Sequence, residues 1–264
     1  MSNVNTIDSA INAAADVGEW SHAPKNVKAE FAGLATRVKK IMDRVEEYER
    51  GPRPAVAISK GNVKMGDVPS VSLPPVATCP NCKGCAKQCY YIRHCCIYPA
   101  VLDAVARNLA LYRTSPATYF NSIIEYCSKN HGRMHRQLDA FRWHVGGDIP
   151  DAKYFEGMVT VAIACPATTF LVFTKNYKVV NEYVENGWPA IPKNLQVIFS
   201  AWPKVEMDNP HNFPTSSPVF PDGACAETEG KVVHKCPGNC RKCFESGSGC
   251  WTLKRGEAVV FPAH

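Results

Sequence analysis

The sequence predicts an α/β fold in which a parallel sheet and its covering helices form a partial or complete (β/α) barrel. Between residues 139 and 200, short apolar segments alternate with amphipathic segments of about ten residues, which is the rhythm of βαβ units. The chain has 264 residues, 45% of them hydrophobic, so it is long enough to bury one large core. A doubly wound sheet is the alternative that shows the same alternation.

The chain begins with a small, polar stretch over residues 1–23, which we interpret as a loosely attached leader. A helix is expected next, from Val27 to Tyr48, because its apolar residues recur three and four apart. Gly51-Pro52 ends it. The apolar stripe either docks on the body of the protein or forms a short dimerising coiled coil. We therefore expect three parts: 1–51 (leader and helix), 52–235 (the barrel) and 236–264 (a cysteine-rich segment packed on the barrel).

The barrel is expected to begin with a strand over residues 69–73, which leads the chain into a cysteine-rich loop. Two helices follow, at 99–113 and 116–129, each opened by a proline. Further along, strands are expected at 141–145, 170–173 and 195–199, with helices at 152–164 and 177–185 between them. The proline- and serine-rich stretch 203–235 is expected to be irregular.

Polar residues at the ends of these strands are the candidates for catalysis, because parallel α/β folds place functional groups at the carboxyl ends of their strands. Arg142, His144, Asp148 and Lys175 occupy such positions. The first three alternate, so we expect them on one face, opposite Phe141 and Trp143. The alternatives are a buried core histidine at 144, a helix cap at Asp148 and a solvated lysine at 175.

Thirteen cysteines are the most unusual feature of the composition. The first 20 residues lack the basic and apolar regions of a secretion signal, and the longest apolar stretch, 157–173, is too short and interrupted for a membrane span. We therefore expect a cytoplasmic chain with no membrane partner. In a reducing cytosol, closely spaced cysteines are more often metal ligands than disulfides, and an odd number cannot all pair.

The first cysteine run, Cys79, Cys82, Cys85 and Cys89, has the spacing C-x2-C-x2-C-x3-C of bacterial ferredoxins. This spacing favours an iron–sulfur cluster, most simply [4Fe–4S]. In ferredoxins the fourth cysteine of the run ligates a second cluster, so membership of one site does not follow for all four. Two further thiols, Cys95 and Cys96, are close enough in sequence to assist.

The second run, Cys236, Cys240, Cys243 and Cys250, suggests a second cluster. Trp251, directly after it, would shield the cluster from water. Zinc is the competing metal, because paired cysteines also build all-thiolate zinc sites. The remaining three cysteines, at isolated positions, are interpreted as packing thiols: Cys127, Cys165 and Cys225.

The net charge of +6 is modest and spread along the chain, without a basic run. Nucleic acid is therefore only weakly supported as a partner, and would accompany the zinc alternative. Two metal clusters would bring the chain closer to neutrality, because bound ions and their thiolates count together. A small molecule or a redox partner of unknown identity is the expected partner.

A further set of motifs is spread over about residues 55–264: Lys60-Gly61-Asn62 to Leu73, Cys85, Cys89-Tyr90, Phe141 to His144, Gly147-Asp148, Asn194 to Ser200, Cys236-Pro237, Cys240, Cys243, Cys250-Trp251 and His264. Together these motifs resemble the phage-encoded "gene product 88-like" family. The resemblance implies a phage or prophage origin, hence the host cytoplasm, but no activity.

The order of strand, cysteine loop, helix and second strand is also similar to radical S-adenosylmethionine barrels. In those enzymes a Gly-Gly-Glu sequence binds the amino group of the cofactor, which implies such a role for Gly146, Gly147 and Asp148. The signature C-x3-C-x2-C of that class stands here in the second run, at the other end of the chain. The hypotheses are an iron–sulfur redox enzyme, an electron-transfer, sensor or structural protein with fully ligated clusters, and a zinc protein that binds nucleic acid.

Overall fold

The computed structural model describes residues 25–82, 85–86, 89–129, 138–203, 205–220, 225, 228 and 230–262, with side chains from residue 33. The leader expected at residues 1–23 and the terminal His264 lie outside the described residues. Within the described ranges, no helix is both long and apolar enough to cross a membrane.

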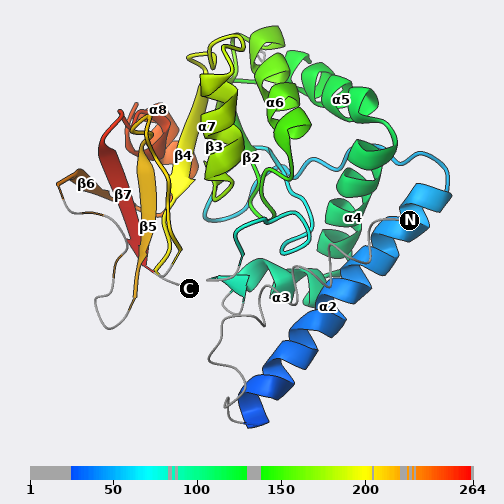
Figure 1. Ribbon diagram of the computed structural model, residues 1–264. Coiled ribbons are helices and arrows are strands. Elements are labelled where there is room, and N and C mark those ends of the chain that lie inside the picture. The colour runs from blue at the N-terminus through cyan, green and yellow to red at the C-terminus, as the bar shows by residue number, and fades with distance from the viewer. Residues whose placement is uncertain are drawn as a thin grey trace.

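A seven-stranded sheet forms the centre of the molecule, and every neighbouring pair of its strands is parallel (Figure 1). The order is β1-β2-β3-β4-β5-β7-β6. The strands are β1 (Ser70–Val71), β2 (Ala140–Trp143), β3 (Thr169–Thr174), β4 (Leu195–Ser200), β5 (Thr215–Val219), β6 (Val232–Lys235) and β7 (Glu257–Pro262).

The parallel strands and their helices together form an open, partial barrel. Strands β1 to β5 follow one another in sequence order, without the reversal that marks a doubly wound sheet. β1 and β6 end the sheet and do not pair with each other, so the described strands do not close a complete barrel. Helices α5, α6 and α7 lie on one side of the strands and α8 on the other (Figure 1).

The predicted helices of the body form nearly where expected. They are α4 (Pro99–Thr114), α5 (Pro116–Ser128), α6 (Ala152–Ala164) and α7 (Tyr177–Glu185). Proline opens α4 and α5, where its missing N–H costs no hydrogen bond. Asp151 caps α6 by accepting a hydrogen bond from the backbone N–H of Tyr154 at 2.9 Å. Asp148 therefore does not cap this helix.

The long N-terminal helix α2 (Lys25–Arg50) confirms the predicted amphipathic helix. Its buried residues Val38, Met42 and Val45 belong to the main core, and the helix crosses α4 (Figure 1). Arg44 adds an ion pair to Asp103 of α4, with Nε 2.7 Å from the carboxylate. The apolar stripe of α2 is therefore covered by the body of the same chain. This is the docked arrangement, and not the dimerising coiled coil.

The expectation of an irregular stretch over 203–235 is wrong, because β5 and β6 lie within it. The sequence of β5, Thr-Ser-Ser-Pro-Val, has a β-branched residue only at each end, and the two serines and the proline between them are typical of a loop. It is nevertheless buried, since β4 and β7 flank it. Four further elements of the described residues had no counterpart in the sequence-based prediction: α3 (Tyr90–Ile97), α8 (Cys240–Glu245), the 3-10 turn η3 (Gly249–Trp251) and β7.

Strand β2 also ends two residues earlier than expected, and this overturns the predicted alternation of side chains. His144 has φ +52°, a left-handed conformation that breaks the pleat. Its ring packs on Tyr154 of α6, on the helix side of the sheet. Arg142 points to the opposite face, toward Met65 and Cys240. Arg142 and His144 therefore do not share a face.

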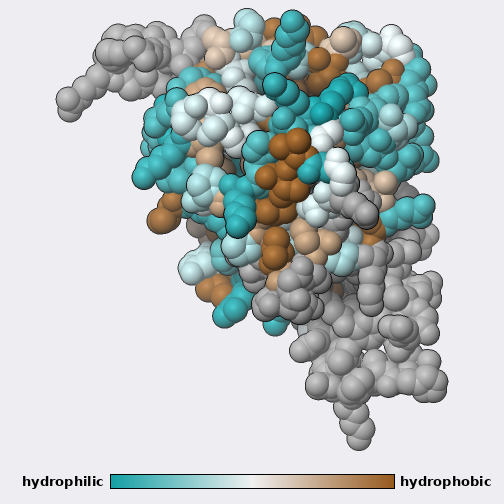
Figure 2. All heavy atoms as spheres, turned by 90° about the vertical axis from the view of Figure 1, so that its left-hand side faces the viewer, coloured by the Kyte–Doolittle hydropathy of each residue, from teal (hydrophilic) through white to brown (hydrophobic). Residues whose placement is uncertain are grey.

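The main core lies between the sheet and helices α4 to α7, and a smaller one lies under α8. Aromatic rings of Phe141, Trp143 and Tyr154 fill the first, all fully buried. The second contains Leu171 and Trp251. Figure 2 shows the side of the molecule that is on the left in Figure 1, where hydrophobic side chains are exposed among hydrophilic ones. Val232 and Val233 of the edge strand β6 are exposed at 62% and 44%.

Asn108 of α4 holds the segment before β1 against the helices. Its side chain is fully buried, accepts a hydrogen bond from the N–H of Ala57 at 2.7 Å, and donates to the carbonyls of Ala57 and Ser72 at 2.9 and 3.0 Å. Three backbone groups from two other segments thus depend on one amide. Loss of this amide would leave them buried without their partner.

We predict that Asn108→Ala lowers the free energy of unfolding by about 2–4 kcal/mol, because buried backbone groups lose their hydrogen bonds. The matched control is Asn121→Ala, at an exposed position of α5, which makes the same change of helix propensity. Urea unfolding of both variants measures the difference. Equal stabilities would contradict the role given to Asn108.

Candidate metal centres

The carboxyl ends of β1, β2 and β3 lie side by side, because the strands are parallel neighbours. The loop that carries the first cysteine run is bonded to this edge. Leu73 donates its N–H to the carbonyl of Gly146 at 3.0 Å, and the N–H of Asp148 lies 3.4 Å from the hydroxyl of Thr78. The strand ends and the cysteine loop therefore form one site, as the sequence predicts for this fold.

The thiols of the first run, Cys79, Cys82, Cys85 and Cys89, are called the first thiol group below. A tight turn joins Cys82 to Cys85, since the N–H groups of Cys85 and Ala86 both bond the carbonyl of Cys82, at 3.0 and 2.8 Å. Burial, followed by the nearby Cys85 thiolate, raises the pKa of Cys82 to about 11. Burial also raises the pKa of Cys79, with contributions from Asp148 and the three other thiols. The four thiols therefore interact electrostatically.

Asp148 is buried beside this group and is fully bonded within the chain. Its Oδ1 accepts from the hydroxyl of Thr174 at 2.6 Å and from the N–H of Ile149 at 2.7 Å, and its Oδ2 accepts from the N–H of Lys175 at 2.8 Å. These bonds tie the end of β2 to the end of β3. Burial raises the pKa of Asp148 even though its bond to Thr174 acts in the other direction.

Lys175 brings a positive charge to the first thiol group. Burial lowers its pKa, but the negative charges of Cys85 and Asp148 outweigh burial and raise it above its ordinary value. Its Nζ also lies 5.4 Å from the ring centre of Trp202. Lys175 is half-buried and its charge interacts with Cys79, Cys85 and Cys89, so it is not a fully solvated lysine.

The two glycines before Asp148 allow close packing of the cysteine loop. A Cβ on Gly146 would stand 2.0 Å from the ring of Tyr91, in the helix that follows Cys89. Gly147 has φ +80°, and a Cβ there would stand 2.6 Å from the carbonyl oxygen of Leu73. Both glycines therefore lie in close packing contacts with the cysteine loop and the helix that follows it.

His144 lies apart from both thiol runs, within the aromatic core. Its Nε2 is 3.1 Å from the hydroxyl of Tyr154, whose oxygen is 2.7 Å from that of Tyr119. Its Nδ1 is buried and has no hydrogen-bond partner among the described residues. Burial, with a smaller contribution from Arg142, lowers the pKa of His144 to about 3. This environment is that of a neutral core histidine.

The thiols of the second run, Cys236, Cys240, Cys243 and Cys250, are called the second thiol group. Three of them come from α8 and η3, which cover the outer face of the sheet. Trp251 donates its indole N–H to the carbonyl of Cys240 at 2.9 Å and joins these two elements. Burial, followed by Cys236, raises the pKa of Cys250 to about 12, against the opposing charge of Arg142.

Arg142 extends from the middle of β2 into this second site. Its Nη1 lies 3.8 Å from the sulfur of Cys240 and 3.8 Å from that of Met65, and its guanidinium carbon lies 4.9 Å from the ring centre of Phe173. Its Nε is buried without a partner among the described residues. Each thiol group thus has one cation beside it, Lys175 or Arg142.

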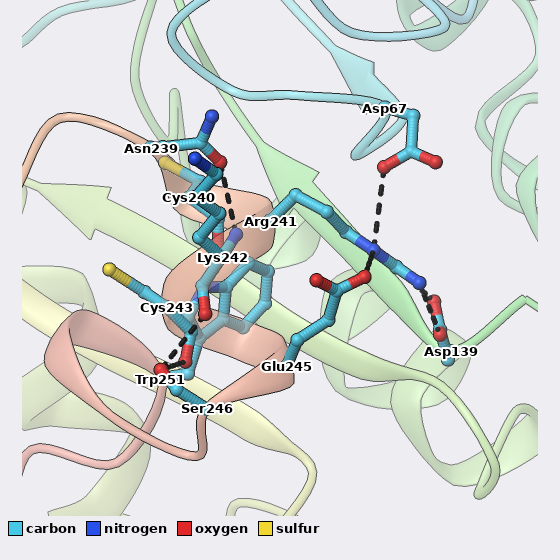
Figure 3. A network of polar contacts seen from close by, with 10 residues as sticks. All are labelled: Asp67, Asp139, Asn239, Cys240, Arg241, Lys242, Cys243, Glu245, Ser246 and Trp251. Carbon is cyan, nitrogen blue, oxygen red and sulfur yellow. Dashed lines mark hydrogen bonds and ion pairs between the residues drawn. The ribbon is translucent and has the colours of Figure 1, made fainter.

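Arg241 of α8 holds the second site in place, and the sequence analysis did not identify it. Its guanidinium bonds both carboxylate oxygens of Asp139, at 2.7 and 2.9 Å, and also Glu245 at 2.9 Å. A longer ion pair joins it to Asp67 at 3.4 Å (Figure 3). Since Asp139 precedes β2 and Asp67 precedes β1, Arg241 anchors α8 to the sheet.

The remaining cysteines belong to neither run, although the charge of Cys89 adds to the effect of burial in raising the pKa of Cys95. Cys95 is buried in α3 and Cys127 in α5, while Cys165 is buried at the end of α6. Cys96 and Cys225 are partly exposed. Cys127 and Cys165 contribute to the main core, consistent with packing thiols.

The described part of the chain contains no group of three or more His, Cys, Asp or Glu side chains arranged to hold a metal ion. A cubane cluster needs a wider arrangement than a single ion, because each thiolate binds a different iron atom. Each of the two donor sets consists of four soft thiols with one half-buried cation beside them. Soft thiolate ligands and a nearby positive charge suit an anionic iron–sulfur cluster.

Comparison with known proteins identifies a family. A family model described as Gene product 88 matches residues 46–234, which include β1 to β5, the first thiol group, Asp148 and Lys175. The match ends before the second thiol group. No curated protein and no solved structure matches the chain.

We predict that Gly66→Ala destabilises the metal-free chain by displacing α8. Gly66 has φ +68°, and a Cβ there would lie 2.6 Å from the Cβ of Arg241. The matched control is Gly187→Ala, with φ +67° and nothing within 4 Å. Both variants lose about 1–2 kcal/mol from backbone strain, and Gly66→Ala loses about 1–3 kcal/mol more from overpacking. Equal losses in urea unfolding would contradict the close contact.

A second prediction concerns the pH dependence of stability through His144. Its pKa is about 3 in the folded chain and ordinarily 6.5, so protonation favours unfolding. Stability is therefore full above pH 6.5 and falls as the pH decreases from 6.5 toward 3. His144→Asn, which tolerates positive φ, should make the slope between pH 6 and 5 shallower by up to about 1.4 kcal/mol per pH unit.

The control for this prediction is Tyr154→Phe. It removes the hydrogen bond to Nε2 but keeps the ring buried, so it should lower stability while preserving the slope. Unfolding free energies at several pH values measure both variants. An unchanged slope in His144→Asn would show that His144 does not carry this pH dependence.

Proposed function

The chain belongs to the gene product 88 family, and on this basis we propose that it is a phage or prophage iron–sulfur redox protein that carries two clusters in the host cytoplasm. The first thiol group would hold one cluster and the second thiol group the other. The observation that carries the proposal is the electrostatic interaction among the thiols of each run, which raise one another's pKa, with one cation beside each group.

The thiol chemistry supports metal binding over a role as inert packing. Burial and mutual repulsion raise the pKa of Cys79, Cys82 and Cys250, so holding several of these thiols together as thiolates needs compensating positive charge. Metal binding displaces the thiol protons and supplies that charge. Packing alone would not require eight thiols in two groups with a cation at each.

A bound iron–sulfur cluster accepts and donates single electrons, and the chain's own residues would set the conditions for this. Lys175 and Arg142 would balance the negative charge of the two sites. Trp251, which is buried and packs its ring on Phe244, would limit access of water to the second site. Asp148 would keep the ends of β2 and β3 together beneath the first site.

The contacts of Asp148 bear on the S-adenosylmethionine hypothesis. Both carboxylate oxygens accept hydrogen bonds from within the chain, and Tyr91 packs against Gly146. These contacts favour a structural role for the Gly146 to Asp148 segment. We therefore favour electron transfer over cleavage of S-adenosylmethionine as the function of the clusters. We expect calorimetry with S-adenosylmethionine to show no binding.

We predict that protein purified without oxygen contains about eight iron and eight sulfide per chain, as two [4Fe–4S] clusters require. It should absorb visible light through thiolate-to-iron charge transfer. Cys82→Ala and Cys250→Ala should each remove about half of the iron, because each breaks one site. Colourless protein with stoichiometric zinc would instead select the zinc alternative and contradict the proposal.

The matched control is Cys127→Ala, which removes a buried thiol of α5 that lies outside both thiol groups. Its iron content should equal that of the unmodified chain. If all three variants lose iron equally, the loss does not follow the two thiol groups, and this contradicts the assignment of the ligands to them.

A further inference from the structure

We propose that Arg142 is the charge partner of the second thiol group and raises the reduction potential of the cluster bound there. The inference rests on the proposed function, since it needs a cluster at that site. Arg142 would thereby control the reduction potential of one of the two clusters. Neither the fold nor the family match specifies such a role.

The contacts of Arg142 are unusual for a guanidinium in a partly buried position. It bonds no carboxylate among the described residues, and its Nη1 approaches only sulfur atoms, those of Cys240 and Met65, each at 3.8 Å. Phe173 covers it, with the ring centre 4.9 Å from the guanidinium carbon. Arg142 also lowers the pKa of Cys250, in opposition to the larger effect of burial, so its charge reaches a second thiol of the group.

A comparison with Arg241 shows that the absence of a carboxylate at Arg142 is a property of the site. Arg241 lies next to Cys240 in sequence, and its guanidinium bonds Asp139 and Glu245. Those acidic groups are used to anchor α8, while Arg142 faces the thiols. Burying a cation without an anionic partner is costly, so thiolates carrying negative charge are the natural partner for Arg142.

The first thiol group has a different charge balance. The charge of Lys175, the cation there, interacts with the carboxylate of Asp148 as well as with the thiols, so a carboxylate opposes part of it. Arg142 has no such compensation among the described residues. Reduction adds one negative charge to a cluster, so an uncompensated cation stabilises the reduced form and raises the potential. The effect should be confined to the second site.

The experiment is a potentiometric titration of the full chain carrying both clusters, monitored by electron paramagnetic resonance. Arg142→Gln should lower one of the two reduction potentials and leave the other unchanged. We expect at least a tenfold decrease of that cluster's reduction equilibrium constant, about 59 mV for one electron. Arg142→Lys keeps the charge and should retain most of the potential. Arg53→Gln, an exposed position, is the matched control and should change neither.

The outcomes separate this inference from the proposed function. Arg142→Gln protein with full iron and sulfide and two unchanged potentials would overturn the inference and leave the proposed function intact. Unmodified protein without iron would overturn the proposed function itself. If Arg142→Gln loses half of its iron, retention of iron by Arg142→Lys supports the charge partnership, and loss in both variants overturns it.

Discussion

Eight of the cysteines stand in two runs, and the thiols within each run influence one another's pKa. Like charges repel and buried charges are poorly solvated, so such groups resist ionisation, and the pKa of Cys82 rises to about 11 and that of Cys250 to about 12. The fold meets this constraint by placing one cation at each group, Lys175 at the first and Arg142 at the second. Positive charge from bound metal is the further compensation that the proposed function supplies.

The parallel sheet positions both groups, by different means. The first lies in a loop at the carboxyl ends of β1, β2 and β3, where Asp148 bonds two of the strand ends together. The second lies on the outer face of the sheet and is anchored by Arg241, through Asp139 before β2. Strand β7 then carries the chain back between β5 and β6, so the C-terminal cysteines are tied to the sheet on both sides of α8.

Local signals in the sequence predict much of this arrangement. Prolines at 99 and 116 and the periodic apolar residues predict the helices closely, and the strand-end rule correctly brings Asp148 and Lys175 to the first cysteine run. Long-range features were not predictable. β5 is a strand because β4 and β7 flank it, although its serines and proline suggest a loop. The ion pair between Arg241 and Asp139 joins residues 102 apart, and the left-handed backbone of His144 reverses the expected face.

The central claim is that this chain binds iron in two separate places. Anomalous diffraction at the iron absorption edge, from crystals of protein purified without oxygen, tests it most directly. The account predicts two iron peaks, one among Cys79, Cys82, Cys85 and Cys89 and the other among Cys236, Cys240, Cys243 and Cys250 beside Arg142. Zinc at these positions, a single iron site, or no metal at either thiol group would contradict it.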